Sequence, residues 1–245
     1  MKTKILAHRG ASAYRPENTM EAFRLAVEQG ADGFELDVHL SKDGHVIVTH
    51  DFTLERLSNG RGRVCDHDLA DLKKLNFNKN ILGWPVCETP TLAEVFALVA
   101  DTSLIVNVEL KTTEVFYPQM PAKLLQQAQE YGMAGRVTYS SFNHYSLMAI
   151  KQLNPEAKIE LLYDLGLVDP WVYAKHLSAT AINPHYLIVK ALPDTVVRCR
   201  ENGVKVNVWT IDDPEDIALM LKLGVDSIIT NKPDVALQIR KEFLE

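Results

Sequence analysis

The sequence predicts a single (β/α)8 barrel, or TIM barrel, that spans residues 1–245. Eight short apolar segments have the character of buried strands, each is followed by a helical pattern or by one long insertion, and polar residues gather where the strands end. Alternation of strand and helix is typical of a parallel sheet, and eight strands are the number that closes a barrel. A doubly wound open sheet is the competing architecture.

The N-terminal part contains one strand–helix unit followed by a hairpin. Residues 5–7 are apolar and predicted as a strand, and Asn18 and Thr19 are expected to cap a helix. Residues 33–38 form the next strand. It returns at 46–51, because the connection contains the hairpin signal Asp43-Gly44 and is too short for a helical crossover.

Residues 52–90 lack a regular pattern apart from a possible short helix at 69–75. A loop of this length in a compact domain is usually functional or a small subdomain. We therefore expect 52–90 to be an insertion, placed after the second barrel strand and its hairpin, that covers the mouth of the site.

Regular alternation resumes at Thr91. Several boundaries carry standard signals, such as Pro170 and Pro193 at helix starts and Gly203 and Gly224 at helix ends. Helices are expected at residues 91–100, 121–131, 144–153, 170–177, 193–202, 213–224 and 233–243, with strands at 104–109, 137–140, 159–162, 181–183, 204–209 and 227–229.

Composition excludes several classes of protein. The net charge of −6 and the pI near 5.8 give no general attraction to nucleic acid or to an anionic membrane. Cys65, Cys87 and Cys199 are odd in number and widely spaced, which argues against a disulfide framework and a zinc site. The N-terminus has too short an apolar run for a signal peptide, and no segment is long enough to span a bilayer, so we expect a cytoplasmic protein.

Carboxylates are predicted to meet at the strand ends. Glu35 and Asp37 are two apart in a strand, so both point to the same face. Glu109 and Lys111 repeat this spacing on the next barrel strand, which allows Glu109 to complete a three-carboxylate site. Buried carboxylates favour a hard divalent ion such as Mg²⁺ or Ca²⁺. A simple salt bridge between Glu109 and Lys111 is the alternative.

Two histidines and two cations complete a site suited to phosphoryl chemistry. His8 and His50 can act as general acid and general base near neutral pH. Arg9 and Lys111 can meet an anionic substrate. Trp209 is expected either to fill the core or to wall the substrate pocket. The remaining histidines, His39, His45, His67, His144, His176 and His185, are predicted to be solvated or structural.

The ordered set of motifs resembles the glycerophosphodiester phosphodiesterase family, in its bacterial cytosolic type, along essentially the whole chain. Each motif alone is weak, but the set in this order is highly specific. In chain order they are His8-Arg9-Gly10, Pro16-Glu17-Asn18-Thr19, Glu35-Leu36-Asp37-Val38, Lys42-Asp43-Gly44, His50-Asp51, Glu109-Leu110-Lys111, Ser140-Ser141-Phe142, Val208-Trp209-Thr210 and Ile228-Ile229-Thr230.

The resemblance implies a TIM barrel that hydrolyses glycerophosphocholine or glycerophosphoethanolamine to glycerol 3-phosphate and an alcohol, using one Mg²⁺ or Ca²⁺. Carried over position by position, it implies catalytic roles for His8 and His50, metal ligation by Glu35, Asp37 and Glu109, phosphate contacts by Arg9 and Lys111, and supporting roles for Glu17 and Asn18. Asn183 and Asn231 depart from the common pattern. We expect these two departures to alter substrate preference or local packing, because neither is a metal or acid–base residue.

Two other functions stay open: a phospholipase D-like or C-like activity on lysolipids, and a barrel that binds without catalysis. The absence of an amphipathic docking stretch argues against stable membrane association. A small-molecule phosphodiester is the expected partner, and a homodimer is possible. The sequence does not choose the head group, the metal, or a lid or interface role for residues 52–90.

Overall fold

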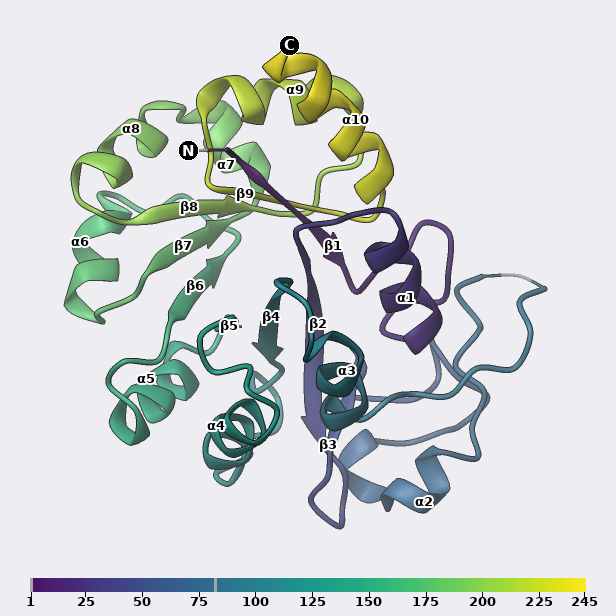
Figure 1. Cartoon of the computed structure of the whole chain (residues 1–245). Helices are drawn as coiled ribbons and strands as arrows, with labels where there is room; N and C mark the ends of the chain where they lie inside the picture. Colours follow the sequence, from purple (N-terminus) through teal and green to yellow (C-terminus); the bar gives the residue numbers. More distant parts are fainter. Residues whose placement is uncertain (1, 82) are drawn as a thin grey trace.

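Eight parallel strands close on themselves and are surrounded by helices in the computed structural model, which describes residues 2–81 and 83–245 (Figure 1). Closure is shown by β1, which pairs in parallel with both β2 and β9. The predicted (β/α)8 barrel is therefore confirmed and the open sheet is excluded. The barrel strands are β1 (Lys4–His8), β2 (Gly33–Leu40), β4 (Ile105–Leu110), β5 (Val137–Ser141), β6 (Ile159–Tyr163), β7 (Ala181–Pro184), β8 (Lys205–Val208) and β9 (Ser227–Thr230).

Strand β2 runs beyond the barrel and folds back, as the Asp43-Gly44 signal predicts. The return strand β3 (Val46–Val48) pairs antiparallel with the end of β2, with Val38 opposite Val48. Directly after β3, the Thr49 amide donates to the Asp37 carbonyl at 3.1 Å. The hairpin thus returns the chain, and His50 with it, to the end of the barrel.

The helices begin where capping residues satisfy their free amides. Thr91 forms a capping box with Glu94, and the Thr19 and Asp213 side chains cap two others. One helix, α7, was not predicted, because six residues are too few to show a periodicity. The helices around the barrel are α1 (Met20–Glu28), α3 (Leu92–Val99), α4 (Met120–Glu130), α5 (His144–Leu153), α6 (Pro170–His176), α7 (Tyr186–Ala191), α8 (Asp194–Glu201), α9 (Pro214–Leu223) and α10 (Pro233–Leu244).

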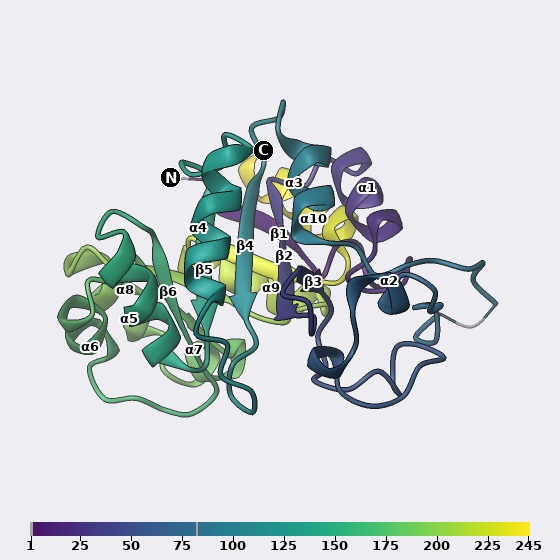
Figure 2. The ribbon, with the colours of Figure 1, turned by 90° about the horizontal axis from the view of Figure 1, so that it is seen from below.

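Residues 52–90 stand beside the β2–β3 hairpin (Figure 2). In the described part of this segment, 52–81 and 83–90, the helices are η1 (Val64–Asp66) and α2 (Leu69–Leu72), the second of which is shorter than the expected 69–75. The segment buries an apolar cluster of its own against β3. That cluster consists of Ile47, Leu54, Leu57, Val64, Leu72, Phe77 and Cys87.

The interior of the barrel is polar beneath the site. One oxygen of the buried Glu160 accepts hydrogen bonds from the amides of Asn107, Asn183 and Asn207 at 3.1, 2.9 and 3.1 Å. Burial raises the pKa of Glu160, and the hydrogen bonds from Asn183 and Asn207 oppose the shift. The side chain of Asn183, one of the two departures from the family pattern, is therefore packed inside the barrel.

Among the described residues, no helix combines the length and the apolar character needed to cross a membrane.

Candidate active site

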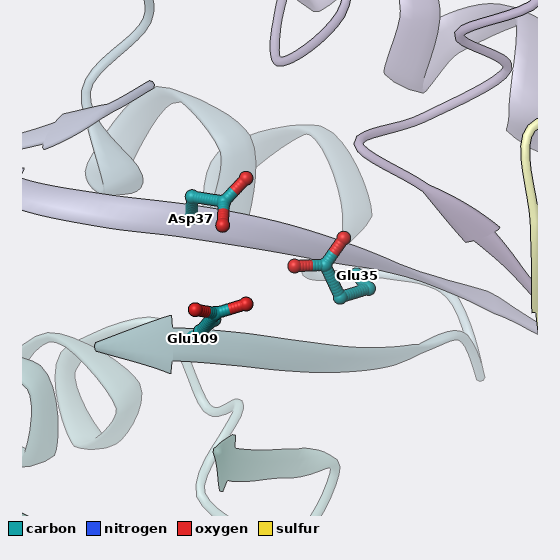
Figure 3. A group of neighbouring side chains, drawn as sticks. All are labelled: Glu35, Asp37 and Glu109. Carbon is teal, nitrogen blue, oxygen red and sulfur yellow. The ribbon is translucent and has the colours of Figure 1, made fainter. Parts of the chain in front are cut away.

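Three buried carboxylates converge at the C-terminal end of the barrel (Figure 3). Glu35 and Asp37 come from β2 and Glu109 comes from β4, where the strand register places it opposite Asp37. One oxygen of each lies within 4.8 Å of the others. The period-2 geometry of the strands explains this arrangement, because alternate side chains face the interior of the barrel.

The donor set fits a divalent cation. One buried oxygen of Glu35 and one of Asp37 accept no hydrogen bond within the described part of the chain. Burial raises the pKa of Glu35 well above its usual range, and the neighbouring charges of Asp37 and Glu109 raise it further. Burial also raises the pKa of Glu109. Oxygen atoms left without a partner in this way are what a hard cation would satisfy.

Two basic side chains lie against the same carboxylates. The backbone amide of Arg9 donates to Glu35 at 3.1 Å, and Nε of the Arg9 side chain lies 3.2 Å from Asp37. Lys111 donates to Glu109 at 2.8 Å and lies 3.7 Å from Asp37. Although burial opposes the shift, Arg9 and Lys111 help to hold the pKa of Asp37 far below its usual range. Glu109 and Lys111 thus form an ion pair, and this pair is part of the carboxylate cluster and not a separate salt bridge.

A tightly wound β1–α1 loop presents Arg9. Arg9, Gly10 and Asn18 all have left-handed backbone angles, with φ of 56°, 79° and 57°. A Cβ at Gly10 would lie 2.6 Å from the backbone of Ala22, so only glycine fits there. Glu17 accepts from Arg9 at 2.7 Å, and the Asn18 amide donates to Asp37 at 2.8 Å.

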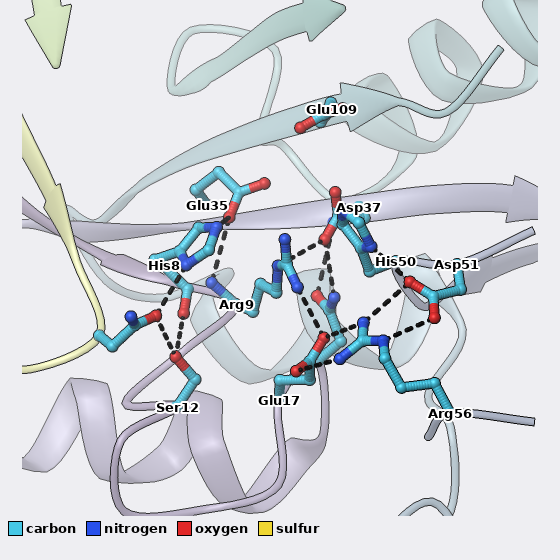
Figure 4. Close-up of polar contacts among 12 residues, drawn as sticks. His8, Arg9, Ser12, Glu17, Glu35, Asp37, His50, Asp51, Arg56 and Glu109 are labelled. Carbon is cyan, nitrogen blue, oxygen red and sulfur yellow. Dashed lines mark hydrogen bonds and ion pairs between the residues drawn. The ribbon is translucent and has the colours of Figure 1, made fainter. Parts of the chain in front are cut away.

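His8 lies beside Glu35, with Nε2 3.9 Å from the nearer carboxylate oxygen (Figure 4). Its Nδ1 donates to the Asn231 side-chain oxygen at 2.7 Å. Asn231 in turn donates to Asp212 at 2.6 Å, which fixes the direction of the amide. Burial, helped by Arg9, lowers the pKa of His8 to about 4. The histidine is therefore neutral at pH 7 with Nε2 unprotonated.

His50 lies beside Asp37, away from His8 (Figure 4). Its Nδ1 donates to Asp51 at 2.6 Å, and Lys111 lies 3.1 Å from Nε2. Arg56, from the 52–90 segment, donates to both oxygens of Asp51 at 2.6 and 2.8 Å. The same guanidinium donates to both oxygens of Glu17 at 3.0 and 2.9 Å.

One cavity joins these groups to an apolar wall. His8, His50, Arg9, Lys111, Glu35 and Glu109 line its charged side. Phe142, Leu162, Trp209 and Ile229 also line it. Trp209 donates through Nε1 to the Asn183 carbonyl at 2.7 Å, and its ring meets Phe142 edge to face at 5.5 Å. Trp209 is thus part of the pocket and not only of the core.

The structure brings the sequence-predicted residues together and adds four that the sequence did not single out in these positions. Asn231 was noted only as a departure, yet it contacts His8 directly. Asp212 and Arg56 belonged to no motif. Asp212 contacts Asn231, 19 residues away, and Arg56 lies in the irregular 52–90 segment and joins Asp51 to the distant Glu17. Phe142 belonged to a motif but was given no place in the site. His39 is buried and donates to the His50 carbonyl at 3.0 Å, as expected of a structural histidine.

Comparison with known proteins agrees with this geometry. The sequence profile of the Glycerophosphoryl diester phosphodiesterase family matches residues 8–235. A glycerophosphodiester phosphodiesterase of Caldanaerobacter subterraneus is 46% identical over 98% of both chains. One from Bacillus altitudinis is 36% identical over 98% of this chain and 99% of that protein.

A solved structure has the same architecture. The phosphodiesterase of Oleispira antarctica in complex with the product sn-glycerol-3-phosphate is 26% identical, with a TM-score of 0.88 and coverage of 97% of this chain and 96% of that one. Given a profile match that spans nearly the whole barrel and relatives of this identity over their full length, this chain belongs to the glycerophosphoryl diester phosphodiesterase family.

Proposed function

We propose that this protein hydrolyses glycerophosphodiesters, such as glycerophosphocholine and glycerophosphoethanolamine, to glycerol 3-phosphate and the free alcohol. The observation that carries the proposal is the buried carboxylate cluster with a histidine on either side of it (Figure 4). The side chains of Arg9 and Lys111 lie against the same cluster. The names of the relatives and the product bound to the Oleispira antarctica enzyme support the same reaction.

We propose that Glu35, Asp37 and Glu109 hold one divalent cation. The all-oxygen donor set suits either Mg²⁺ or Ca²⁺. A cation bound there supplies positive charge that offsets the negative charge of the phosphate oxygens. Arg9 and Lys111 add to this charge from the protein side, because each already lies within 4 Å of Asp37. Glu17 and Asn18 keep Arg9 and Asp37 in place.

His8 and His50 are proposed as the acid–base pair. One histidine removes the proton of the hydroxyl group that attacks phosphorus, and the other histidine gives a proton to the oxygen of the leaving alcohol. Each imidazole is oriented through Nδ1, by Asn231 and by Asp51 respectively, which leaves Nε2 as the nitrogen that serves the substrate. Lys111 contacts Nε2 of His50 at 3.1 Å, next to the place proposed for the phosphate. Trp209 forms part of the wall against which the substrate is placed.

Substitution of the two histidines tests these roles. We expect His8→Ala and His50→Ala each to lower kcat by about 10²-fold or more while the thermal unfolding midpoint and cation binding are kept. His45→Ala is the matched control, since His45 is exposed in the hairpin turn and pairs with Asp43 and not with the carboxylate cluster. Near wild-type turnover in both active-site variants would contradict the proposal. Substrate binding by calorimetry with no product after long incubation would indicate a binding protein instead.

A further inference from the structure

A second cavity opens at the N-terminal end of the barrel, the end opposite the carboxylate cluster. Its volume of about 630 Å³ lies within the range of sites that bind small molecules. The function proposed above uses none of its lining residues. Basic side chains outnumber acidic ones there, although the whole chain carries a net charge of −6. The charged lining residues are Lys2, Lys4, Arg136, Lys158 and Lys205 against Glu160 and Asp226.

Strand geometry directs three of these lysines toward the barrel axis. Alternate side chains of a strand face the same way. Lys158 and Lys205 each stand two residues before a member of the polar network inside the barrel, Glu160 and Asn207 respectively. Lys4, the first residue of β1, is in phase with the last residue of that strand, which lines the catalytic cavity. All three lysines therefore face the interior of the barrel at its N-terminal end.

The three lysines belong to one layer of the barrel interior. Such layers are built from alternate strands. β1, β8 and β6 alternate in this way, since β9 and β7 lie between them. With the shear typical of this kind of barrel, the strand pairings bring Lys4, Lys158 and Lys205 to one level, and Ile105 of β4 completes the set. We call Lys4, Lys158 and Lys205 the lysine layer.

Hydrogen bonds two residues further along the same strands agree with this register. Glu160 of β6 accepts from Asn107 of β4 and Asn207 of β8, both at 3.1 Å. Glu160 and Asn207 each follow a member of the lysine layer by two positions, so their contact brings those members to one level as well. Branched apolar side chains dominate the interior layers of TIM barrels, and three lysines in one layer are therefore a departure that needs an explanation.

Ion pairs within residues 2–81 and 83–245 do not neutralise the lysine layer. The two acidic residues of the cavity lining accept hydrogen bonds from amides instead. Lys158 gives one of its three protons to the Gly135 carbonyl at 2.7 Å. Three positive charges around one cavity repel one another, and an anion between them removes that repulsion. The lysines that do form ion pairs in these ranges are Lys73, Lys74, Lys111, Lys190 and Lys241.

We propose that this cavity binds a small organic anion that carries two or more negative charges on phosphate groups. The ammonium groups of the lysine layer contact the phosphate oxygens, for which lysine is a common partner. Leu6 and Ile105 also line the cavity, which suits a ligand with a carbon skeleton. Because the charges surround a cavity, a small molecule fits better than a nucleic acid or an acidic protein surface. The site is independent of the reaction at the other end of the barrel.

Calorimetric titration with fructose 1,6-bisphosphate tests the proposal on the full chain loaded with Mg²⁺. We expect saturable binding that weakens as the salt concentration rises, since the contacts join opposite charges. The double variant Lys4→Gln, Lys205→Gln should raise Kd about tenfold or more, because two charge-assisted contacts are lost. Its turnover of glycerophosphocholine should stay unchanged, because neither residue lines the catalytic cavity.

Two control variants separate this site from net charge and from the catalytic centre. The double variant Lys74→Gln, Lys241→Gln removes the same charge from side chains that are 73% and 69% exposed and lie outside the cavity lining. Lys111→Gln removes a positive charge from the catalytic cavity. We expect both to keep the wild-type Kd for the bisphosphate. Thermal unfolding midpoints show whether each variant is folded.

Several results would overturn the inference. These are no binding of the bisphosphate by the wild type at low salt, or an unchanged Kd in the Lys4→Gln, Lys205→Gln variant. Equal weakening by the two double variants would show that only net charge matters. Loss of binding in Lys111→Gln alone would place the bisphosphate at the catalytic centre. Binding that follows the lysine layer in a protein that fails to hydrolyse glycerophosphocholine would support this inference and contradict only the proposed function.

Discussion

The side-chain amide of Asn231 determines which nitrogen of His8 faces the cavity. Asp212 accepts hydrogen bonds from both the backbone and the side chain of Asn231, at 2.8 and 2.6 Å. Since a carboxylate only accepts, the amide oxygen of Asn231 must point at His8, and Nδ1 of that ring must carry the proton. The sequence marked position 231 as a departure but could not show this contact, which joins two ends of the chain.

Replacement of Asn231 should therefore change catalysis more than substrate binding. We expect Asn231→Leu to lower kcat about 10- to 100-fold with little change in KM, the size of effect seen when a partner that orients a site group is lost. Asn231→Asp keeps an acceptor for Nδ1 and should retain more activity, although repulsion from Asp212 will lower its unfolding temperature. Nitrogen NMR shifts of His8 report the tautomer directly. Asn202→Leu, at the C-terminal end of α8, is the control. Wild-type kcat in Asn231→Leu would contradict the assignment.

Cation binding should depend on pH through Glu35 and Glu109. Burial raises the pKa of both carboxyl groups, so without a cation they keep their protons to higher pH than an exposed glutamate does. Because the folded state binds these protons more tightly, the raised pKa values stabilise it at low pH. This contribution to the free energy of unfolding is lost as the pH rises through the pKa of the folded state. Binding requires the carboxylates and therefore releases protons.

The expected result is a larger rise of the unfolding temperature with Ca²⁺ or Mg²⁺ at pH 8 than at pH 5.5, measured by thermal denaturation. Proton release on binding can be confirmed by calorimetry in two buffers of different ionisation enthalpy. Glu35→Gln should lose most of the rise at both pH values. An equal rise at the two pH values, or a wild-type rise in Glu35→Gln, would place the cation elsewhere.

At the scale of elements, the Arg56 side chain connects the 52–90 segment to the site. Arg56 binds Asp51, which orients His50, and Glu17, which holds Arg9. A second contact between the segment and the β1–α1 loop is made by Arg15, whose guanidinium lies 4.5 Å from the centre of the Trp84 ring. The segment is therefore connected to both sides of the catalytic centre.

Loss of Arg56 should lower activity without unfolding the protein. We expect Arg56→Ala to reduce kcat/KM about tenfold or more, because Asp51 and Glu17 lose the donor that fixes them. The effect on stability should stay below about 1 kcal/mol, since the side chain is 45% exposed. Arg61→Ala, in the same segment, is the matched control. Equal kinetics for the two variants would show that the segment does not position the site.

Elements with local signals were predictable and those without them were not. Thr91, Asp213 and Gly224 mark helix ends by their own chemistry, and the structure places helix ends at each of them. Helix α7 is too short to show a period. The fold of residues 52–90 depends on an apolar cluster whose members are irregularly spaced, so no pattern along the chain reveals it.

For the whole molecule, the alternation of strands and helices was sufficient to predict a closed barrel, and the spacing of Glu35, Asp37 and Glu109 was sufficient to place three carboxylates on one interior face. The apolar wall of the cavity was not predictable. Its members come from four separate places in the chain, the loop after β5, strand β6, the segment after β8 and strand β9, and they are Phe142, Leu162, Trp209 and Ile229. Closure of the barrel brings them together.

The most direct test of the central claim is release of glycerol 3-phosphate from glycerophosphocholine, followed with a coupled dehydrogenase. The protein is first treated with EDTA and then given Mg²⁺ or Ca²⁺. We predict no product after chelation and restored turnover with one or both ions, because Glu35, Asp37 and Glu109 form the only cluster of potential ligands found among residues 2–81 and 83–245. Absence of glycerol 3-phosphate with either ion, or equal turnover with and without EDTA, would contradict a metal-dependent glycerophosphodiesterase.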